Sequence, residues 1–202
     1  MGNCVITISR EYGSGGHAIG KRLAALLGIP FYDREVVELT AQKHGLDEAR
    51  LNEMEDQSKL SLRFGFSSFT SFADTDERLF LLQSQTVVEL VQQSCVIVGR
   101  CADFVLKEHP DRCSFFIYSG LKQRLTHIDR QKNIYHAENP AQMVTKMDRR
   151  RAAYYKYHTG QEWGAPSNYH LCVDSGVLGA KTADVFAAFL HLREQIRGGT
   201  QA

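Results

Sequence analysis

The sequence has almost no net charge and no long apolar run. Its 202 residues include 24 basic and 23 acidic side chains, so it lacks the excess positive charge that a dedicated nucleic-acid-binding protein uses. No apolar stretch approaches the roughly 20 residues of a membrane-spanning helix, and no signal peptide is visible. We therefore expect a cytoplasmic protein whose partners include neither a nucleic-acid polymer nor a membrane.

Paired metal-binding cysteines are also missing. The five cysteines are odd in number, irregularly spaced and without a C-x-x-C pair. Most of them lie in apolar runs, which is typical of buried free thiols in a reducing compartment. We therefore name no metal-ligating residue in this chain.

One stretch combines a strand, a glycine-rich loop and a helix. Val5–Ile8 is a β-branched run typical of a buried strand, and Ile19 and Leu23 later recur at the spacing of a buried helix face. Glycines between them let backbone N–H groups close on an anion at the positive end of the helix dipole. We therefore assign phosphate binding to Gly13, Ser14, Gly15, Gly16, His17 and Ala18.

The loop departs from the strict phosphate-loop pattern G-x-x-x-x-G-K-[ST]. That pattern can be placed on Gly15–Lys21, but an arginine then stands where the Ser/Thr belongs. Lys21 also lies about 200° round the helix from the buried Ile19. We therefore expect Lys21 to be a solvated helix residue.

A second register fits the local structure better. Here the loop begins at Ser9, directly after the strand, and strand, loop and helix join without strain. Gly16 and His17 then stand where the usual lysine and Ser/Thr would be. The nearby sources of positive charge in this register are Arg10 and His17.

The same glycines also match a dinucleotide-binding fingerprint. Gly13, Gly15 and Ala18 satisfy G-x-G-x-x-[GA], and Asp33 follows at about the distance of a ribose-binding acid. This favours a dinucleotide-dependent oxidoreductase. The four residues Ser9–Tyr12 between strand and first glycine favour instead a loop around a terminal phosphate chain, because a dinucleotide turn is tight.

Apolar runs and helical stretches alternate along the rest of the chain. Short apolar runs follow at about 31–33, 95–98, 113–118 and 169–173, with helical periodicity between them. This alternation is typical of a doubly wound α/β domain with a parallel sheet. With 43% hydrophobic residues, the 202 residues can bury one full core, so we expect a single domain over 1–202.

Charged side chains follow three of the predicted strands. Arg10 follows the first, Asp33 and Arg34 the second, and Gly99–Arg100 the third. Strand ends are often polar because turns are polar, but ligands of doubly wound sheets bind at the carboxyl ends of the strands. Three such positions beside a phosphate loop favour one site. Arg100 offers the bidentate fork that suits a second phosphate.

The segment 124–158 is rich in cations. A solvated helix face is one interpretation, since most charge runs are of that kind. Phosphoryl transfer, however, needs movable cations over the transferred group and a closure that excludes water. A basic helical hairpin after the fourth strand is where a kinase lid would lie, and Asp148 could orient one of the arginines of this segment.

Five sequence blocks resemble one family. They are S-R-E-Y-G-S-G-G, G-I-P-F-Y-D-R-E, V-I-V-G-R-C-A-D-F-V-L, D-R-R-R-A-A-Y-Y-x-Y-x-T-G-Q-E-W-G and S-N-Y-H-L. From Ile6 to about Gly179 the chain resembles the cytidylate kinase-like proteins, a branch of the P-loop nucleoside monophosphate kinases. The resemblance implies a three-layer α/β P-loop kinase fold with a five-stranded parallel sheet. It also implies a helical monophosphate-binding section at about 34–94 and an arginine-rich lid at about 124–165.

The resemblance carries roles to individual residues. Gly13–Gly16 fall on the phosphate loop, and Asp33 falls at the acceptor site. Gly99–Arg100 resembles a Gly-Arg-Asp acceptor element in which Cys101 replaces the acid, and a D-x-x-R lid motif matches at 148–151. With the residue pattern, this assigns catalysis to Arg10, Arg124, Arg130, Asp148, Arg149 and Arg151, and acceptor binding to Asp33, Arg34 and Arg100.

The resemblance implies a nucleotide kinase that uses ATP and Mg²⁺. Its substrates would be a nucleoside triphosphate and a nucleoside monophosphate of the cytidylate type. The missing loop lysine and hydroxyl leave open a nucleotide-binding protein with little or no kinase activity. The dinucleotide-dependent oxidoreductase is a weaker alternative, because no acid–base constellation accompanies its fingerprint. A homodimer is also open.

Overall fold

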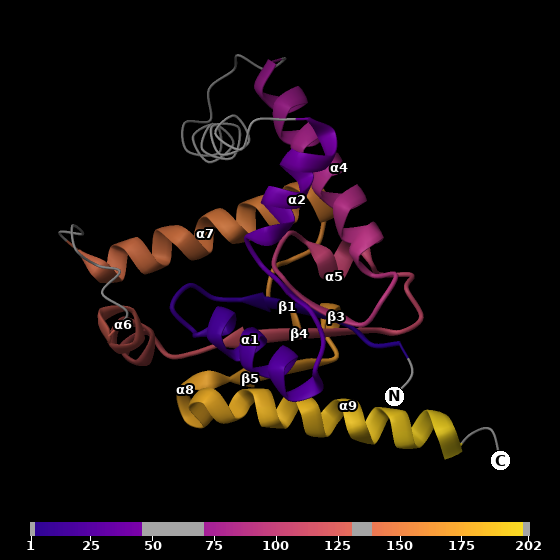
Figure 1. Ribbon diagram of the computed structural model, residues 1–202. Helices are drawn as coiled ribbons and strands as arrows, with labels where there is room; N and C mark the ends of the chain where they lie inside the picture. Colours follow the sequence, from indigo (N-terminus) through magenta and orange to yellow (C-terminus); the bar gives the residue numbers. More distant parts are fainter. Residues whose placement is uncertain (1–2, 46–70, 131–138, 200–202) are drawn as a thin grey trace.

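The computed structural model describes residues 3–45, 71–130 and 139–199, without the side chains of 71–76, 129–130 and 199. Figure 1 shows a central sheet with helices on both of its faces. Two parts of the predicted monophosphate-binding section and lid, at 46–70 and 131–138, lie outside the described residues, and so does the side chain of Arg130.

Five parallel strands form the sheet, in the order β2-β3-β1-β4-β5. They are β1 (Val5–Arg10), β2 (Phe31–Tyr32), β3 (Cys95–Val98), β4 (Arg112–Tyr118) and β5 (Leu171–Asp174). Val5 of β1 pairs with Cys95 on one side and Arg112 on the other. The central strand β1 therefore brings the loop that follows it between the carboxyl ends of its two neighbours, and the predicted five-stranded parallel sheet is confirmed.

This strand order argues against the dinucleotide-binding interpretation. In the dinucleotide-binding fold the second strand lies directly beside the first. Here β3 lies between β1 and β2 and pairs with both. The match to the dinucleotide fingerprint is therefore local, and the topology is that of a different α/β fold.

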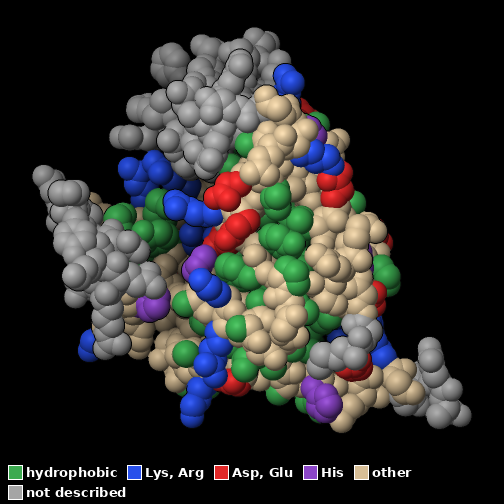
Figure 2. Space-filling model, in the orientation of Figure 1, with side chains coloured by type: hydrophobic (Ala, Val, Ile, Leu, Met, Phe, Trp, Pro, Cys, Tyr) green, Lys and Arg blue, Asp and Glu red, His purple; other side chains and the backbone are tan. Residues whose placement is uncertain are grey.

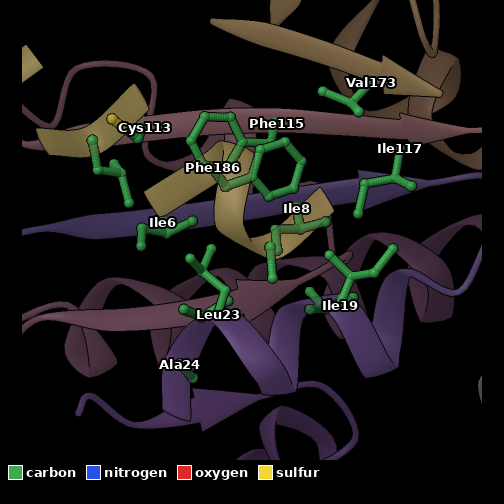
Figure 3. Close-up of a cluster of buried hydrophobic side chains, with 14 residues drawn as sticks. Ile6, Ile8, Ile19, Leu23, Ala24, Cys113, Phe115, Ile117, Val173 and Phe186 are labelled. Carbon is green, nitrogen blue, oxygen red and sulfur yellow. The ribbon is translucent and has the colours of Figure 1, made fainter. Parts of the chain in front are cut away.

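Helices α1 (Gly16–Leu27) and α9 (Thr182–Gly199) cover one face of the sheet. Ile19 and Leu23 of α1 are buried against Ile6 and Ile8 of β1, together with the fully buried Phe186 of α9 (Figure 3). Helix α1 ends where Gly28 adopts a left-handed conformation. The apolar spacing therefore places the N-terminus of α1 at the carboxyl edge of the sheet.

Among the described residues, three helices cover the other face: α2 (Glu35–His44), α4 (Ser71–Leu90) and α5 (Ala102–Val105). Val36 of α2 and Val87 of α4 are fully buried against Val5 and Ile97 of the sheet. Alternate residues of the central strands thus enter two different clusters, as expected for a parallel sheet covered on both faces. The α/β three-layer arrangement predicted from the sequence is confirmed.

The remaining elements lie around the carboxyl edge and the end of the chain. They are α6 (Leu121–Arg130), α7 (Pro140–Thr159), α8 (Ser175–Leu178) and two 3₁₀ turns, η1 (Pro166–Asn168) and η2 (Gly179–Lys181). In Figure 1, α6 and α7 lie on the side of the loop that joins β1 to α1. Within the described part of the chain, every helix is too short or too polar to cross a membrane.

The first strand is longer than the sequence predicts. Ser9 and Arg10 continue the parallel ladder opposite Phe116 and Ile117 of β4. The loop therefore begins at Glu11, two residues later than in the preferred register. Because the sequence pattern shows apolar alternation and not hydrogen bonding, it could not show that two polar residues extend the strand.

Helix α7 packs on α4 through an aromatic cluster that makes stability depend on pH. The His158 ring stacks on Phe80 with 4.2 Å between centroids, and burial lowers the pKa of His158 from 6.5 to about 4. Between these two pH values His158 is protonated in the unfolded chain and neutral in the folded chain. The free energy of unfolding therefore falls as the pH decreases from about 6.5 towards 4.

We expect the parent protein to lose about 1–2 kcal/mol more unfolding free energy than His158→Phe when the pH falls from 7 to 5. The range allows for solvent screening, because the ring is only partly buried. Urea unfolding at both pH values measures this change. His191→Phe is the control, because His191 is exposed on α9. An equal pH response of His158→Phe and the parent would contradict the assignment.

Candidate functional site

The loop between β1 and α1 leaves backbone N–H groups available at the start of a helix. Gly13 and Gly15 both have φ of +80°, a conformation that glycine adopts without steric cost. Gly15 is the N-cap residue of α1, and no side chain caps this helix end. The N–H groups of the first turn are therefore left for an anion.

Glycine at position 16 is required by the side chain of Arg10. A Cβ on Gly16 would lie 2.6 Å from Cγ and 2.7 Å from Cβ of Arg10. The aliphatic stem of Arg10 thus fills the space in which the lysine of the phosphate-loop pattern would begin. The missing lysine and the position of Arg10 are two parts of one local arrangement.

A cavity of about 460 Å³ opens beside the loop, within the size range of small-molecule sites. Its basic residues are Lys122 and His127 of α6, and the described residues that line it include no Asp or Glu. The His127 ring atoms Cε1 and Nε2 each lie 3.5 Å from where a Cβ of Gly15 would be. The cavity is lined by Gly13, Ser14, Gly15, Ala18, Ile19, Ser119, Lys122, Gln123, Thr126, His127, Ser175, Gly176, Gly179 and Ala180.

A cluster of charged side chains lies on the other side of the loop. Nη2 of Arg10 is 3.4 Å from Oδ1 of Asp33, and Nδ1 of His17 is 2.6 Å from Oδ2 of the same carboxylate. Burial lowers the pKa of Arg10 to about 9, and the charges of Arg151 and Arg100 add to this effect. The guanidinium thus stays charged at neutral pH. Figure 2 shows basic, acidic and histidine side chains gathered on this face.

The turn after β3 holds backbone strain. Gly99, Arg100 and Cys101 have φ values of +80°, +59° and +50°, and a non-glycine residue pays about 1–2 kcal/mol in this region. The guanidinium of Arg10 lies against Gly99, where a Cβ would overlap it. Strain of this kind clusters at binding sites, and here Arg100 lies close enough to Arg10 to affect its pKa.

Side chains of α7 bind the backbone of β1 and of the loop that follows it. Oδ1 of Asp148 accepts the N–H of Tyr12 at 2.7 Å, and its Oδ2 pairs with Arg124 of α6. Arg124 also donates to the carbonyl of Tyr12 at 3.3 Å. Arg151 donates to the carbonyl of Arg10 at 2.9 Å. The predicted lid motif at 148–151 therefore fixes the conformation of the phosphate loop.

Removal of the Asp148 carboxylate should destabilise the protein strongly. Asp148→Ala leaves the 11% exposed Arg124 without this carboxylate partner and the N–H of Tyr12 without its acceptor. We expect a loss of about 2–3 kcal/mol in the free energy of unfolding, at or below the lower end for fully buried pairs that lose one partner, because Arg124 keeps Glu11 at 3.6 Å. Denaturant unfolding measures it.

Asp184→Ala is the matched control, because it breaks the exposed pair with Arg22 and should cost less than about 1 kcal/mol. A similar loss in both variants would mean that the Asp148 pair does not hold the loop.

A buried carboxylate near the end of β1 was not predicted from the sequence, because no motif marks it. Asp103 of α5 accepts hydrogen bonds from Tyr155 of α7 at 2.6 Å and from Ser9 of β1 at 3.3 Å. Burial raises the pKa of Asp103, and the hydrogen bonds oppose this effect. Burial and the nearby carboxylate also raise the pKa of Tyr155. This network joins α5, α7 and the end of β1 beneath the charged cluster.

Most of the sequence-predicted site residues lie at the carboxyl edge of the sheet. Gly13–Gly16 form the loop, and Ala18 lines the cavity beside it. Asp33 and Arg151 lie close to Arg10, as does Arg100. Arg34 and Arg149 are exposed, Arg34 at the N-cap of α2 and Arg149 on α7, and no contact with the cluster supports either of them.

Two predicted side chains have partners that the sequence did not indicate, and two residues of the cavity were not assigned to the site. The ring of His17 contacts Asp33, and Arg124 pairs with Asp148 and Glu11. Lys122, one of the cations of this region, and His127 were not assigned to the site, although both line the cavity. They reach the cavity because α6 packs on the loop through Ile128 and Gly13. No local sequence pattern indicates this contact. Lys21 is exposed, as expected.

Comparisons with known proteins agree with this geometry. A shikimate kinase from Acinetobacter baumannii, solved with shikimate, is similar at a TM-score of 0.53 and 15% identity over 95% of each chain. A gluconokinase from Sinorhizobium meliloti is similar at a TM-score of 0.52 and 12% identity, over 96% of this chain and 97% of that one. These likenesses show the P-loop kinase fold.

A stronger likeness comes from an uncharacterized protein of Eubacterium ventriosum, with a TM-score of 0.70 and 24% identity over 93% of this chain and 98% of that one. No curated protein sequence is significantly similar. The model of the cytidylate kinase-like family matches residues 5–177. With the phosphate loop, the strand order and this match over most of its length, the chain belongs to the cytidylate kinase-like family.

Proposed function

We propose that this protein is a nucleotide kinase that transfers the γ-phosphoryl group of ATP to a nucleoside monophosphate of the cytidylate type. One observation carries the proposal: at the open N-terminus of α1, His127 lies beside Gly15 and Arg10 lies beside Gly16. On one side is the cavity with Lys122 and His127, and on the other is the cluster around Arg10. Family membership and the P-loop kinase fold support the same reaction class.

The chain contributes position and charge. An acceptor phosphate oxygen attacks the γ-phosphorus in line, the bond from that phosphorus to the β–γ bridging oxygen breaks, and the electron pair leaves with ADP. The N–H groups at Gly15 and Gly16 hold the triphosphate. Arg10 and Arg100 neutralise the acceptor phosphate, while Arg151 fixes the backbone of Arg10.

Magnesium enters this proposal as part of the substrate, bound to the phosphates of ATP. Residue 17, where the loop pattern has Ser/Thr, is a histidine whose ring faces Asp33. The described residues also contain no cluster of three or more His, Cys, Asp or Glu side chains that could hold a metal ion. The residues present therefore do not fit a metal ion held by the protein itself.

ADP formation from ATP and Mg²⁺ tests the proposal, with one acceptor added at a time. The panel contains CMP, dCMP, UMP, AMP and GMP, and also shikimate and gluconate as acceptors of P-loop kinases with a similar fold. We expect ADP above the acceptor-free rate with a pyrimidine monophosphate. Turnover of shikimate or gluconate alone would contradict the nucleotide assignment.

A nucleotide-binding protein with little turnover is the second candidate. It is favoured by the arrangement of Gly16 and Arg10, which excludes a lysine at the loop. Binding of ATP by calorimetry together with no ADP formation for any acceptor would select this candidate.

Location and assembly are part of the same proposal. The cysteines are free, which supports a cytoplasmic protein in a reducing compartment. Leu192 and Ile196 of α9 are 57% and 71% exposed, which supports a homodimer through this helix. Light scattering of the parent protein and of Ile196→Glu tests the dimer.

A further inference from the structure

We propose that Ser175 is a positioning residue of the phosphate site: its hydroxyl holds the Ser14–Gly15 peptide so that the N–H of Gly15 is directed at a bound triphosphate. This inference rests on the proposed function, because it assigns a role beside the same phosphate loop. Ser175 is the first residue of α8 and lies 161 positions from Ser14 in the sequence, outside every loop motif.

The Ser175 hydroxyl lies against the backbone of the loop. Its Oγ donates to the carbonyl oxygen of Ser14 at 2.7 Å and lies 3.1 Å from the carbonyl oxygen of Tyr118. A hydroxyl has one proton to donate, so the shorter contact, to Ser14, is the stronger. Ser175 is 8% exposed, so water competes little for this proton. One side chain thus joins the end of β4, the start of α8 and the phosphate loop.

Ser14 is also held from its other side. Its Oγ donates to the carbonyl oxygen of Glu11 at 2.9 Å, and its N–H donates to the same oxygen at 3.4 Å. Its neighbours Gly13 and Gly15 have no side chain that could restrict the backbone. The conformation of the loop at this point therefore depends on the contacts of Ser14.

The direction of the Gly15 N–H follows from that of the Ser14 carbonyl. The two groups belong to one planar trans peptide unit, in which they point in opposite directions. Because the carbonyl oxygen is bound by Ser175, the N–H points away from α8. Gly15 is the N-cap of α1, where backbone N–H groups have no partner within the helix. The hydroxyl therefore fixes a phosphate donor before the ligand arrives.

Calorimetric titrations with Mg·ATP and with tripolyphosphate, at one pH and one ionic strength, test the proposal. Ser175→Ala removes the hydroxyl without adding bulk. Ser84→Ala is the matched control, because Ser84 of α4 also donates to a backbone carbonyl, that of Phe80, at 2.7 Å. We expect Ser175→Ala to bind both probes about three- to tenfold more weakly than the parent protein, the range that one neutral hydrogen bond contributes. Ser84→Ala should bind them as tightly as the parent.

NMR separates positioning from a direct contact with the ligand, which is the alternative because Ser175 also lines the cavity. Protein labelled with ¹³C at serine carbonyls and ¹⁵N at glycines shows only Ser–Gly peptides, which occur at 14–15, 119–120 and 175–176. In ligand-free Ser175→Ala, the Ser14 carbonyl carbon should move upfield, because it accepts one hydrogen bond fewer. Saturating tripolyphosphate should move the Gly15 amide proton downfield in the parent, and less far in the variant.

Equal affinity of Ser175→Ala and the parent for both probes would overturn the inference and leave the proposed function intact. An unmoved Ser14 carbonyl signal in the ligand-free variant would do the same. A parent protein that binds neither probe would overturn the proposed function, and the inference with it.

Discussion

Gly15→Val should abolish nucleotide binding, weakening the affinity for ATP at least a hundredfold. The φ of +80° at Gly15 strains any β-branched residue. The added methyl groups would also enter the space beside His127, whose ring lies 3.5 Å from the Cβ position. Both effects move the N-terminus of α1, on which anion binding depends. Calorimetry with ATP measures the loss.

Gly28→Val separates backbone strain from damage to the site. Gly28 has a φ of +66° at the opposite end of α1, and a Cβ there meets no atom within 4 Å. This variant should lose about 1–2 kcal/mol of stability and keep the affinity of the parent protein for ATP. ATP binding that survives in Gly15→Val would show that the loop does not hold the nucleotide.

Arg100→Ala should lower kcat/KM for the nucleoside monophosphate at least a hundredfold and change the Kd for ATP less than threefold. Arg100 lies close enough to Arg10 to lower its pKa, and a guanidinium fork binds a phosphate in two places. Loss of such a contact removes charge neutralisation on the acceptor only. Steady-state kinetics with the acceptor found in the panel, together with ATP calorimetry, measures the two effects separately.

Arg100→Gly tests the backbone strain and the loss of the guanidinium at the same position. Glycine tolerates the φ of +59°, so this variant should be more stable than the parent by up to about 1 kcal/mol while losing the same acceptor use. Arg22→Ala, which breaks an exposed pair on α1, should leave kinetics unchanged. Equal loss of ATP binding and acceptor use in Arg100→Ala would place Arg100 on the wrong side of the loop.

Sequence patterns predicted those elements whose apolar side chains are regularly spaced and buried. The apolar run from Val5 and the helical spacing of Ile19 and Leu23 gave the strand and helix that flank the loop, because these side chains are buried in one cluster. The rule that ligands bind at the carboxyl ends of parallel strands predicts that Arg10 and Asp33 lie at one site, and they form an ion pair.

The orientation of individual side chains could not be predicted in this way. His17 was expected at the phosphate, but the distance of 2.6 Å to Asp33 depends on how β2 ends beside α1. Arg124 was assigned to catalysis, but its pairing with Asp148, 24 residues away, could not be predicted. His127 lines the cavity only because α6 packs on Gly13. Such contacts between distant segments leave no periodic trace in the sequence.

A structure of the protein with a non-hydrolysable ATP analogue would test the central claim most directly. We predict the β- and γ-phosphates within hydrogen-bond distance of the backbone nitrogens of Gly15, Gly16 and His17, with the nucleoside in the cavity lined by α6 and α8. An analogue bound elsewhere, with the N-terminus of α1 empty of phosphate, would contradict the account.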